Sequence, residues 1–346
     1  MSVHQGADEV EPGQPVIATA ANGRIMEASL VGKHGTVVKG AISPDGASWQ
    51  SNEPLGYGKT YTLTATARGA DGEPATTKST FTTATPEREV AVSMNVQDGQ
   101  TVGVGMPLIF TFTGAVADKV AAEKALEVTT EPQIEGAFRW FGDERVIWRP
   151  KEYWPSGTTV SVNAAIYGKH LGDGVFGTAD TSARMTIGDK LVAVADGDTY
   201  QMKVYVNDRE VRSLPVSMGK PSTSTPNGTY TLMSEHTGYV MDSSTYGVAV
   251  NSSAGYRLVV DYAVRMSDSG IFYHSAPWSL AQQGNTHTSH GCINLSTENA
   301  AWLMKLSQPG DLLTVLNAGD QVLEPTDGWS VWQLSWEEWL ANAAGR

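Results

Sequence analysis

The chain has 346 residues, of which 18% are charged, and a formal net charge of −13. This length predicts more than one domain, and the negative charge argues against binding to nucleic acid or to an anionic membrane surface. No apolar run is long enough to span a bilayer, and the N-terminal residues lack the charged-then-apolar pattern of a secretory signal. The single cysteine excludes an internal disulfide.

The first half of the chain contains an internal repeat, in which WQSNEPLGYGKTYTLTATARG (49–69) resembles WRPKEYWPSGTTVSVNAAIYG (148–168). Seven positions align at a constant offset of 99 residues: Trp49, Gly58, Thr60, Tyr61, Leu63, Ala65 and Gly69 with Trp148, Gly157, Thr159, Val160, Val162, Ala164 and Gly168. Both copies end in an apolar/polar alternation after a glycine, which predicts a half-buried strand. The repeat predicts two successive immunoglobulin-like sandwiches, and chance similarity between two hairpins is the alternative.

Composition changes mark the domain boundaries. A proline and a charge cluster in TTATPEREV follow the first strand set, and TIGDK closes the second. We therefore expect a mainly β protein with a first immunoglobulin-like domain at 1–86, a second at 87–188, a third, β-rich domain at 189–318 and a short helical C-terminal extension at 319–346.

The third domain begins with a hairpin in QMKVYVNDREVRSLPVSMG, followed by a Ser/Thr/Pro-rich loop (219–232) that leads through an Asn-Gly turn to a strand. A second hairpin turns at 268–270 and ends at His274. Ser296 is expected to cap a helix that ends before Pro309-Gly310. The apolar face of this helix would contain Ala300, Leu303, Met304 and Leu306, and DLLTVLN would form the last strand.

The C-terminal extension carries four tryptophans at intervals of three, four and three residues: Trp329, Trp332, Trp336 and Trp339. This spacing predicts one stripe of a helix. A ligand-stacking or membrane-lying helix is one interpretation. We favour a helix that docks its tryptophans on another domain, because Glu337 and Glu338 oppose membrane binding.

The only cysteine, Cys292, lies in THTSHGCINL. A thiol attacks as its thiolate, and a nearby imidazole can take its proton. His290 lies two residues upstream, and His274 ends a strand 18 residues upstream. Gly291 permits a backbone geometry that could direct successive N–H groups at one point, as an oxyanion site requires.

Two other interpretations of Cys292 remain open at this stage. His287, His290 and Cys292 form H-x-x-H-x-C, and His274 could supply a fourth metal ligand. Structural zinc usually has paired ligands at two separated places, whereas here only one cluster exists, so a metal site is less favoured. An inert buried cysteine with surface histidines is the second alternative, which spacing alone does not exclude.

A longer sequence pattern favours Cys292 as a nucleophile over the metal ligand and the inert buried cysteine. His274-x14-Ser289-His290-Gly291-Cys292-Ile293-Asn294 resembles the signature of the L,D-transpeptidases, enzymes with a YkuD-type catalytic domain that cross-link peptidoglycan. The resemblance extends over the chain: PLGYGKTYTLTATARG, GKPSTSTPNGTY and FYHSAPWSLAQQGNTHTSHGCINL are each similar to stretches of these enzymes. Two immunoglobulin-like domains, a catalytic domain and a tryptophan-rich extension resemble the mycobacterial and related actinobacterial members.

The resemblance implies catalytic roles. Cys292 would attack the carbonyl of the third residue of a donor stem tetrapeptide and expel D-alanine. His274 would accept the thiol proton and later deprotonate the acceptor amine, and Ser275 would orient the imidazole. His290 would shape the loop beside the thiol, with its backbone and those of Gly291 and Cys292 facing the oxyanion.

The resemblance also implies a substrate site. Tyr256 would line the pocket as part of a mobile lid. The other expected lining or contact positions are Met241, Trp278, Ser269, Gly270, Ser289 and Asn294. A second stem peptide would then resolve the thioester through a side-chain amine and give a 3→3 cross-link, and carbapenems would acylate the enzyme.

The implied setting is extracytoplasmic, with an export signal or lipid anchor preceding this sequence and no cofactor. Three rival functions remain: a cysteine peptidase or carboxypeptidase that hydrolyses stem peptides, an enzyme that attaches other amines to the wall, and a non-catalytic wall-binding module.

A glycine-rich segment, KHLGDGVFG (169–177), lies where some relatives carry an acidic, calcium-associated loop. Asp173 remains, but His170 stands where an acidic residue is expected, and calcium prefers oxygen ligands. We therefore favour a plain glycine-rich turn over a calcium site at Asp173 and Gly174, and we expect no metal.

Overall fold

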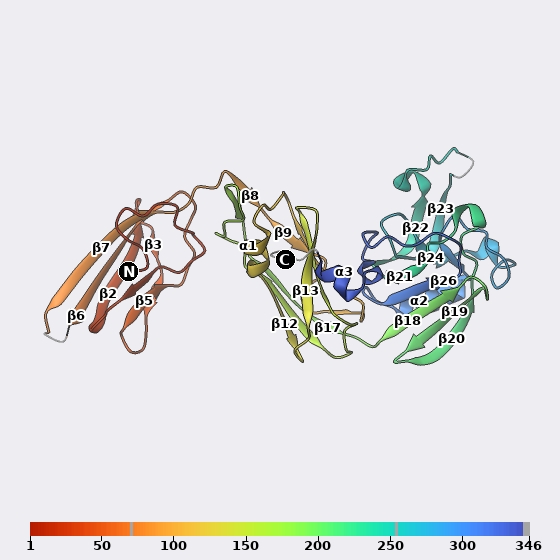
Figure 1. The fold of residues 1–346 in the computed structure, drawn as a ribbon, viewed down its shortest axis with the longest axis horizontal. Helices are drawn as coiled ribbons and strands as arrows, with labels where there is room; N and C mark the ends of the chain where they lie inside the picture. Colours follow the sequence, from red (N-terminus) through yellow and green to blue (C-terminus); the bar gives the residue numbers. More distant parts are fainter. Residues whose placement is uncertain (70–71, 253–254, 342–346) are drawn as a thin grey trace.

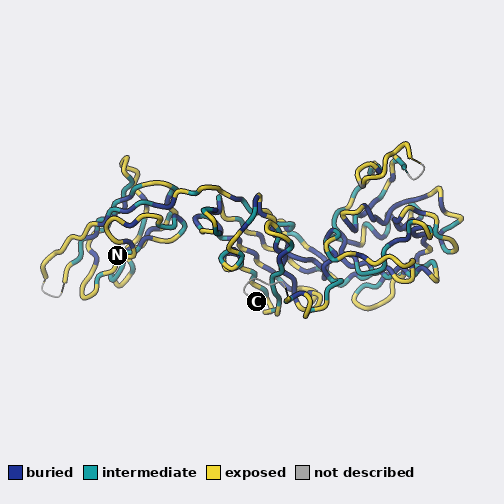
Figure 2. Tube along the Cα trace, turned by 45° about the horizontal axis from the view of Figure 1, so that its top comes forward, coloured by how far each residue is buried: buried dark blue, intermediate teal, exposed yellow. Residues whose placement is uncertain are grey.

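A computed structural model describes residues 1–69, 72–252 and 255–341 of the chain. Three β-rich units follow one another along the long axis, in sequence order (Figure 1). Each unit has its own buried interior, and exposed residues gather at its loops (Figure 2). The predicted mainly β fold is confirmed. In the part of the chain that the structure describes, no helix is long and apolar enough to cross a membrane.

The first unit is a sandwich of two antiparallel sheets, with strand orders β3-β2-β6-β7 and β1-β5-β4. Its strands are β1 (Ile17–Thr19), β2 (Gly23–Gly32), β3 (Val37–Val38), β4 (Gly40–Ile42), β5 (Ser48–Ser51), β6 (Thr60–Gly69) and β7 (Pro74–Thr82). The predicted alternation in β6 directs Tyr61, Leu63 and Ala65 inward, because successive side chains of a strand point to opposite faces.

The second unit is a sandwich with strand orders β13-β14-β11-β9 and β10-β17-β15-β12, plus the small pair β16-β8. Its elements are β8 (Arg88–Val90), β9 (Val92–Met94), β10 (Gln100–Val102), β11 (Leu108–Phe112), α1 (Lys119–Ala125), β12 (Leu126–Glu131), β13 (Gly136–Phe141), β14 (Arg145–Pro150), β15 (Thr159–Ala164), β16 (Val175–Gly177) and β17 (Thr181–Ile187). Strand β15 alternates as β6 does.

The sequence repeat has a structural counterpart. In the first unit the indole of Trp49 lies against Gly40, where an added Cβ would meet a ring atom at 2.1 Å. In the second unit Trp148 lies against Gly136, where the same clash would occur at 2.0 Å. Both tryptophans are buried in the core of their sandwich. Two successive sandwiches, as predicted, therefore place the same tryptophan over the same kind of glycine.

The third unit contains a five-stranded sheet of order β20-β19-β18-β26-β21 and a four-stranded sheet of order β22-β23-β24-β25. Its elements are β18 (Leu191–Asp196), β19 (Gln201–Val206), β20 (Arg209–Pro215), η1 (Pro221–Thr223), β21 (Gly228–Thr231), β22 (Ser234–Asp242), η2 (Ser243–Tyr246), β23 (Arg257–Arg265), β24 (Phe272–Ser275), η3 (Pro277–Ser279), β25 (Ile293–Leu295), α2 (Thr297–Leu306) and β26 (Leu312–Leu316). The core lies between the two sheets and α2.

Most local predictions for this unit hold. Asn207 and Asp208 have φ of 49° and 63°, as a tight hairpin turn requires, and the Ser296 side chain caps α2. Two details differ. Gly228 begins β21 instead of forming a turn before it. Leu306 is 40% exposed, because it ends the helix beyond the face that contacts the sheet.

The single tryptophan helix predicted for the extension is wrong. Two short elements, η4 (Val331–Gln333) and α3 (Trp336–Leu340), are separated by Leu334 in an extended conformation. Ser335 then starts α3 with a capping box. The predicted docking is confirmed, because Trp339 is fully buried and its indole N–H donates to the Ala137 carbonyl at 2.9 Å.

Candidate active site

Two neighbouring parallel strands bring the cysteine and a histidine to one face of a sheet. Strand β24 pairs with β25 so that His274 lies opposite Asn294. Cys292 precedes Asn294 by two residues and continues the line of β25. Because side chains alternate along a strand, Cys292, Asn294 and His274 point to the same side. Strand pairing therefore brings together two residues that lie 18 positions apart in the sequence.

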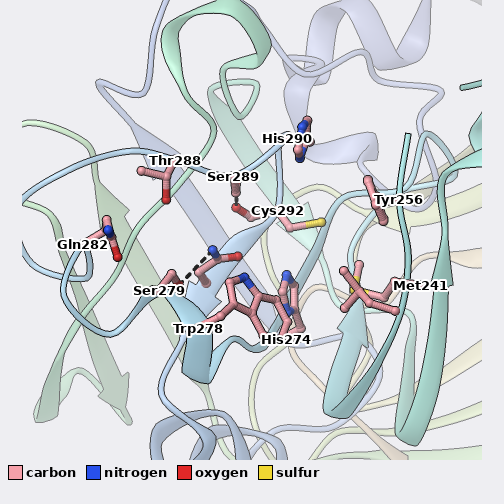
Figure 3. Close-up of a pocket in the computed structure, with 12 residues that line it drawn as sticks. Met241, Tyr256, His274, Trp278, Ser279, Gln282, Thr288, Ser289, His290 and Cys292 are labelled. Atoms are coloured by element: carbon pink, nitrogen blue, oxygen red, sulfur yellow. Dashed lines mark hydrogen bonds between the residues drawn. The ribbon is translucent and has the colours of Figure 1, made fainter. Parts of the chain in front are cut away.

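These side chains line a cavity of about 320 Å³ (Figure 3). Predicted site residues in its wall are Met241, Tyr256, His274, Trp278, Ser289, His290, Cys292 and Asn294. Sequence reasoning missed four others: Leu258, Ser279, Gln282 and Thr288. Met241 and Tyr256 lie on one side of the sulfur, and Trp278 lies beside His274. The cavity thus joins an apolar wall to a polar one.

His274 is held as a neutral imidazole. Its Nδ1 lies 2.9 Å from the backbone carbonyl oxygen of Ser275, and a carbonyl only accepts, so Nδ1 carries the hydrogen. Burial lowers the pKa of His274 below its usual value. The Trp278 ring stacks on the imidazole with centroids 5.9 Å apart. Nε2 is therefore left with a lone pair that can accept a proton.

Cys292 is a neutral thiol at rest. Its side chain is buried, and burial raises the pKa of Cys292 to about 11, although a hydrogen bond from the Phe272 backbone acts in the opposite direction. The Sγ atom lies 3.5 Å from the Gly270 carbonyl oxygen. The site therefore contains an uncharged thiol and an uncharged imidazole, so attack requires proton transfer.

The loop before Cys292 is fixed by Ser289. The Ser289 hydroxyl donates to the Cys292 carbonyl at 2.6 Å and accepts the Gly291 N–H at 3.1 Å. Gly291 has a φ of 130°, and an added Cβ would meet Ile271 at 2.9 Å. The Gly291 N–H, one of the three amides expected to face the oxyanion, is therefore bonded to the Ser289 hydroxyl in this structure. The amides of His290 and Cys292 bond to no residue that the structure describes.

His290 lies at the rim of the cavity and is exposed. Its ring contacts Tyr256 with centroids 5.6 Å apart, and its Nε2 lies 3.5 Å from the Lys220 ammonium. Partial burial and the Lys220 charge lower the pKa of His290. A neutral ring above the thiol follows from this arrangement.

His287, a ligand in the metal interpretation, points elsewhere. Its Nδ1 accepts the Met218 N–H at 3.0 Å and its Nε2 lies 3.0 Å from the Gly197 carbonyl oxygen. Both ring nitrogens are thus used by the backbone. Across residues 1–69, 72–252 and 255–341, no group of three or more His, Cys, Asp or Glu side chains could hold a metal ion.

The glycine-rich segment is a tight turn. Gly172, Asp173 and Gly174 have φ of 88°, 47° and 66°, and the Val175 N–H donates to the Gly172 carbonyl at 2.9 Å. The His170 ring packs on Phe176 with centroids 5.0 Å apart. Among the described residues, Asp173 belongs to no group of three or more His, Cys, Asp or Glu side chains that could hold a metal ion.

Comparison with known proteins places this geometry in a family. The L,D-transpeptidase catalytic domain family, YkuD, matches residues 190–316, and the Bacterial Ig domain family matches residues 7–170. The chain is 45% identical to L,D-transpeptidase 2 of Mycobacterium tuberculosis, over 99% of this chain and 84% of the relative. It is 36% identical to L,D-transpeptidase 5 of the same species, over 98% and 75%. The chain belongs to the L,D-transpeptidase family.

Solved structures agree with this assignment. An LD transpeptidase in complex with imipenem is 39% identical with a TM-score of 0.56, covering 65% of this chain and 97% of that chain. Mycobacterium tuberculosis L,D-transpeptidase 3 with a faropenem-derived adduct is 35% identical with a TM-score of 0.54, covering 65% and 98%. The molecule is accordingly an L,D-transpeptidase with a catalytic domain on immunoglobulin-like domains.

Two residues that the sequence assigned to the site of this L,D-transpeptidase have distinct surroundings. The Ser275 position contacts the imidazole of His274 through its backbone carbonyl, while its hydroxyl accepts the backbone N–H groups of Asp261 and Tyr262. Ser269 is exposed outside the cavity, and its hydroxyl bonds to Asp327 at 2.6 Å.

A supporting residue of the transpeptidase site was also missed. The buried Thr225 hydroxyl donates to the Gly291 carbonyl at 2.6 Å and accepts the Gly219 N–H at 3.0 Å. It lies in the stretch GKPSTSTPNGTY, whose resemblance to the family was visible without indicating which of its hydroxyls mattered. Thr225 therefore fixes the glycine next to the nucleophile from a separate loop.

Proposed function

We propose that this L,D-transpeptidase forms 3→3 peptidoglycan cross-links through a thioester on Cys292. The observation that carries the proposal is that Cys292 and His274 line one cavity from neighbouring strands, with the imidazole Nδ1–H fixed on the Ser275 carbonyl. This arrangement leaves Nε2 as the proton acceptor, and it keeps the sulfur unreactive until a substrate is bound.

In the first half-reaction, Nε2 of His274 takes the thiol proton as Sγ attacks the carbonyl carbon of the third residue of a donor tetrapeptide stem. The oxygen of the tetrahedral intermediate is stabilised by the free amides of His290 and Cys292. The intermediate collapses as the C–N bond breaks, and the imidazolium donates its proton to the departing D-alanine amine. Cys292 then carries the acyl group as a thioester.

In the second half-reaction, a side-chain amine of another stem peptide attacks the thioester carbonyl. His274 removes a proton from this amine as the C–N bond forms, and the C–S bond breaks. The thiolate then recovers a proton from the imidazolium. The products are a 3→3 amide and the neutral resting pair, so proton and acyl transfers balance over the cycle.

The cavity wall supports binding of a peptide stem. Met241, Tyr256 and Trp278 supply apolar surface for the aliphatic part of the donor. Asn294 is oriented by a hydrogen bond from its Nδ2 to the Ser279 hydroxyl at 3.1 Å, and its side-chain Oδ1 would accept a stem amide N–H. The Ser289 hydroxyl holds the loop backbone at Gly291 and Cys292, and the Gly270 carbonyl oxygen lies 3.5 Å from the sulfur.

The same chemistry extends to β-lactams of the carbapenem class. Attack of Sγ on the lactam carbonyl would break the ring C–N bond. The released amine would remain attached to the acyl group on Cys292 and so could not diffuse away. Complexes of two similar enzymes with imipenem and with a faropenem-derived adduct support this extension.

We propose that the enzyme acts outside the cytoplasmic membrane, where stem peptides are located. We also propose that its domain boundaries lie near residues 86, 188 and 318.

Mass spectrometry after incubation with a carbapenem and with a tetrapeptide stem tests this proposal. Wild-type protein should gain the mass of the drug, and Cys292→Ala should gain none; a persisting adduct on Cys292→Ala would contradict the nucleophile assignment. His274→Ala should slow acylation by roughly 10²-fold or more, since general base catalysis is lost. Release of free tripeptide in place of a cross-linked dimer would indicate a peptidase.

A further inference from the structure

The turn between β23 and β24 contacts the thiol and is ordered by its own serines. The Ser267 hydroxyl accepts the Ile271 N–H at 3.0 Å, and it lies 2.9 Å from the Ser269 hydroxyl. Gly270 follows with a φ of 95°, which favours glycine. This conformation directs the Gly270 carbonyl to 3.5 Å from Cys292 Sγ.

A carboxylate from the C-terminal extension completes this turn. Asp327 Oδ1 accepts the Ser269 N–H at 2.8 Å, and its Oδ2 accepts the Ser269 hydroxyl at 2.6 Å. Because the Ser269 proton goes to the carboxylate, the Ser267 hydroxyl must donate to Ser269. The hydrogen bonds therefore run in one direction, from the Ile271 amide through two hydroxyls to a carboxylate that can only accept.

The second immunoglobulin-like domain holds the residue next to this carboxylate. Arg145 of β14 donates from Nη2 to the Gly328 carbonyl at 3.0 Å. Gly328 has a φ of 69°, and an added Cβ would lie 3.1 Å from the Cα of Ser267. A continuous set of contacts thus leads from Arg145 through Gly328 and Asp327 to the turn beside the nucleophile.

We propose that Asp327 is a positioning residue, which holds the Gly270 carbonyl against Cys292 and so sets the reactivity of the thiol. The inference rests on the proposed function, in which Cys292 is the nucleophile. A thiol that is neutral at rest depends on the placement of its sulfur between His274 and the substrate carbonyl. Small displacements of reacting atoms cost large factors in rate, so a loosened turn slows acylation.

This role differs from simple stabilisation of an exposed loop. Ser269 is exposed, so water can replace the carboxylate when Asp327 is shortened, and the fold is retained. The geometry of the Gly270 carbonyl is then no longer fixed. A positioning role therefore predicts a loss in the acylation step with little loss in initial drug binding, whereas unfolding would reduce the amount of active enzyme and leave the rate of the remainder unchanged.

Acylation of the full chain by imipenem, followed by stopped-flow absorbance and mass spectrometry, separates the binding constant from the first-order acylation step. Asp327→Ala should lower the acylation step by about tenfold while binding stays within about twofold. Asp327→Asn, which keeps one acceptor oxygen for the Ser269 N–H, should recover part of the rate. Asp320→Ala, an exposed acidic residue of the same extension, should match wild type.

A double variant identifies the route of the effect. If Asp327 acts through Ser269, Ser269→Ala with Asp327→Ala should be no slower than the slower single variant. An unchanged acylation step in Asp327→Ala, or fully additive losses in the double variant, would overturn the inference. Failure of wild-type protein to form any adduct would instead refute the proposed function, so the two failures are distinguishable.

Discussion

The two immunoglobulin-like domains share a repeat but differ in what covers their sheets. The offset of 99 residues makes Arg149 of β14 equivalent to Gln50 of β5. Gln50 faces solvent, whereas Arg149 is only 2% exposed. Its guanidinium lies 4.6 Å from the ring centroid of Trp332 and 4.7 Å from that of Trp339. The same strand position is thus a free surface in one domain and a docking site in the other.

The contacts between neighbouring units show the same contrast. The second domain donates backbone N–H groups of Gly103 and Gly105 to the carbonyls of Pro309 and Gly310, at 2.9 and 2.8 Å. Leu312 of β26 belongs to the core of the second domain. The first domain meets the second largely through tyrosine side chains. One fold therefore supports the catalytic domain in one copy and extends the chain in the other.

Removing the docked guanidinium should have the largest effect. Arg149 donates to the Leu334 carbonyl at 2.9 Å, and burial lowers the pKa of Arg149 to about 10, so it is charged at neutral pH. Arg149→Ala loses these bonds and the buried cation–π contacts, and should lower the free energy of unfolding by about 3 kcal/mol.

The equivalent change in the first domain is the control. Gln50→Ala should alter the free energy of unfolding by no more than about 0.5 kcal/mol, because it removes a surface side chain. Denaturant titration measures both, and acylation by imipenem should slow only in Arg149→Ala, since the extension also carries Asp327. Equal losses in the two variants would show that the domains do not differ in this way.

A buried acid makes the contact between the second domain and the catalytic domain depend on pH. Asp311 Oδ1 packs against Gly103 so closely that a Cβ added to this glycine would lie 2.3 Å from the oxygen. This oxygen has no hydrogen-bond partner among the described residues. Burial raises the pKa of Asp311 to about 8. The folded protein therefore binds a proton between about pH 4 and pH 8 that the unfolded chain releases.

Because of this difference in proton binding, the free energy of unfolding falls as the pH rises. Stability contributed by protonated Asp311 is present at low pH and is lost as the pH rises, at about 1.4 kcal/mol per pH unit within that window. Asp311→Asn should reduce this slope in denaturant titrations from pH 5 to pH 8. Asp8→Asn, an exposed acid of the first domain, should leave the slope unchanged. A slope that persists in Asp311→Asn would assign it to other acids, such as Glu235.

The features that sequence predicted are those set by local pattern. Alternation in β6 and β15 is a property of consecutive residues, and the spacing of His274 and Cys292 fits two strands joined by one connection. The prediction of a single helix in the extension was wrong, because Trp332, Trp336 and Trp339 reach the Arg149 guanidinium from two separate short elements. The extended Leu334 and the cap at Ser335 break the helical period.

The supporting residues of the active site were beyond prediction for a physical reason. Asp327 reaches Ser269 across 58 residues, and Thr225 reaches Gly291 across 66. A lone carboxylate or hydroxyl in a loop has no periodicity, so nothing in the sequence distinguishes it from neighbouring polar residues. The hydrogen bond of the Gly291 amide was also not predicted from sequence, because the geometry of the turn fixes its partner.

The weaker contact of the first domain gives the smallest expected effect. The Tyr57 hydroxyl donates to the Gly177 carbonyl at 2.6 Å and accepts the Gly168 N–H at 2.9 Å. Burial raises the pKa of Tyr57 to about 12, so the hydroxyl stays protonated through neutral pH. Tyr57→Phe removes both bonds while keeping the ring, and should cost about 1 kcal/mol at this contact. Small-angle scattering should detect a wider spread of orientations of the first domain, while acylation by imipenem remains at the wild-type rate. A slower acylation step in Tyr57→Phe would mean that the first domain also constrains the active site, which would remove the contrast between the two repeats.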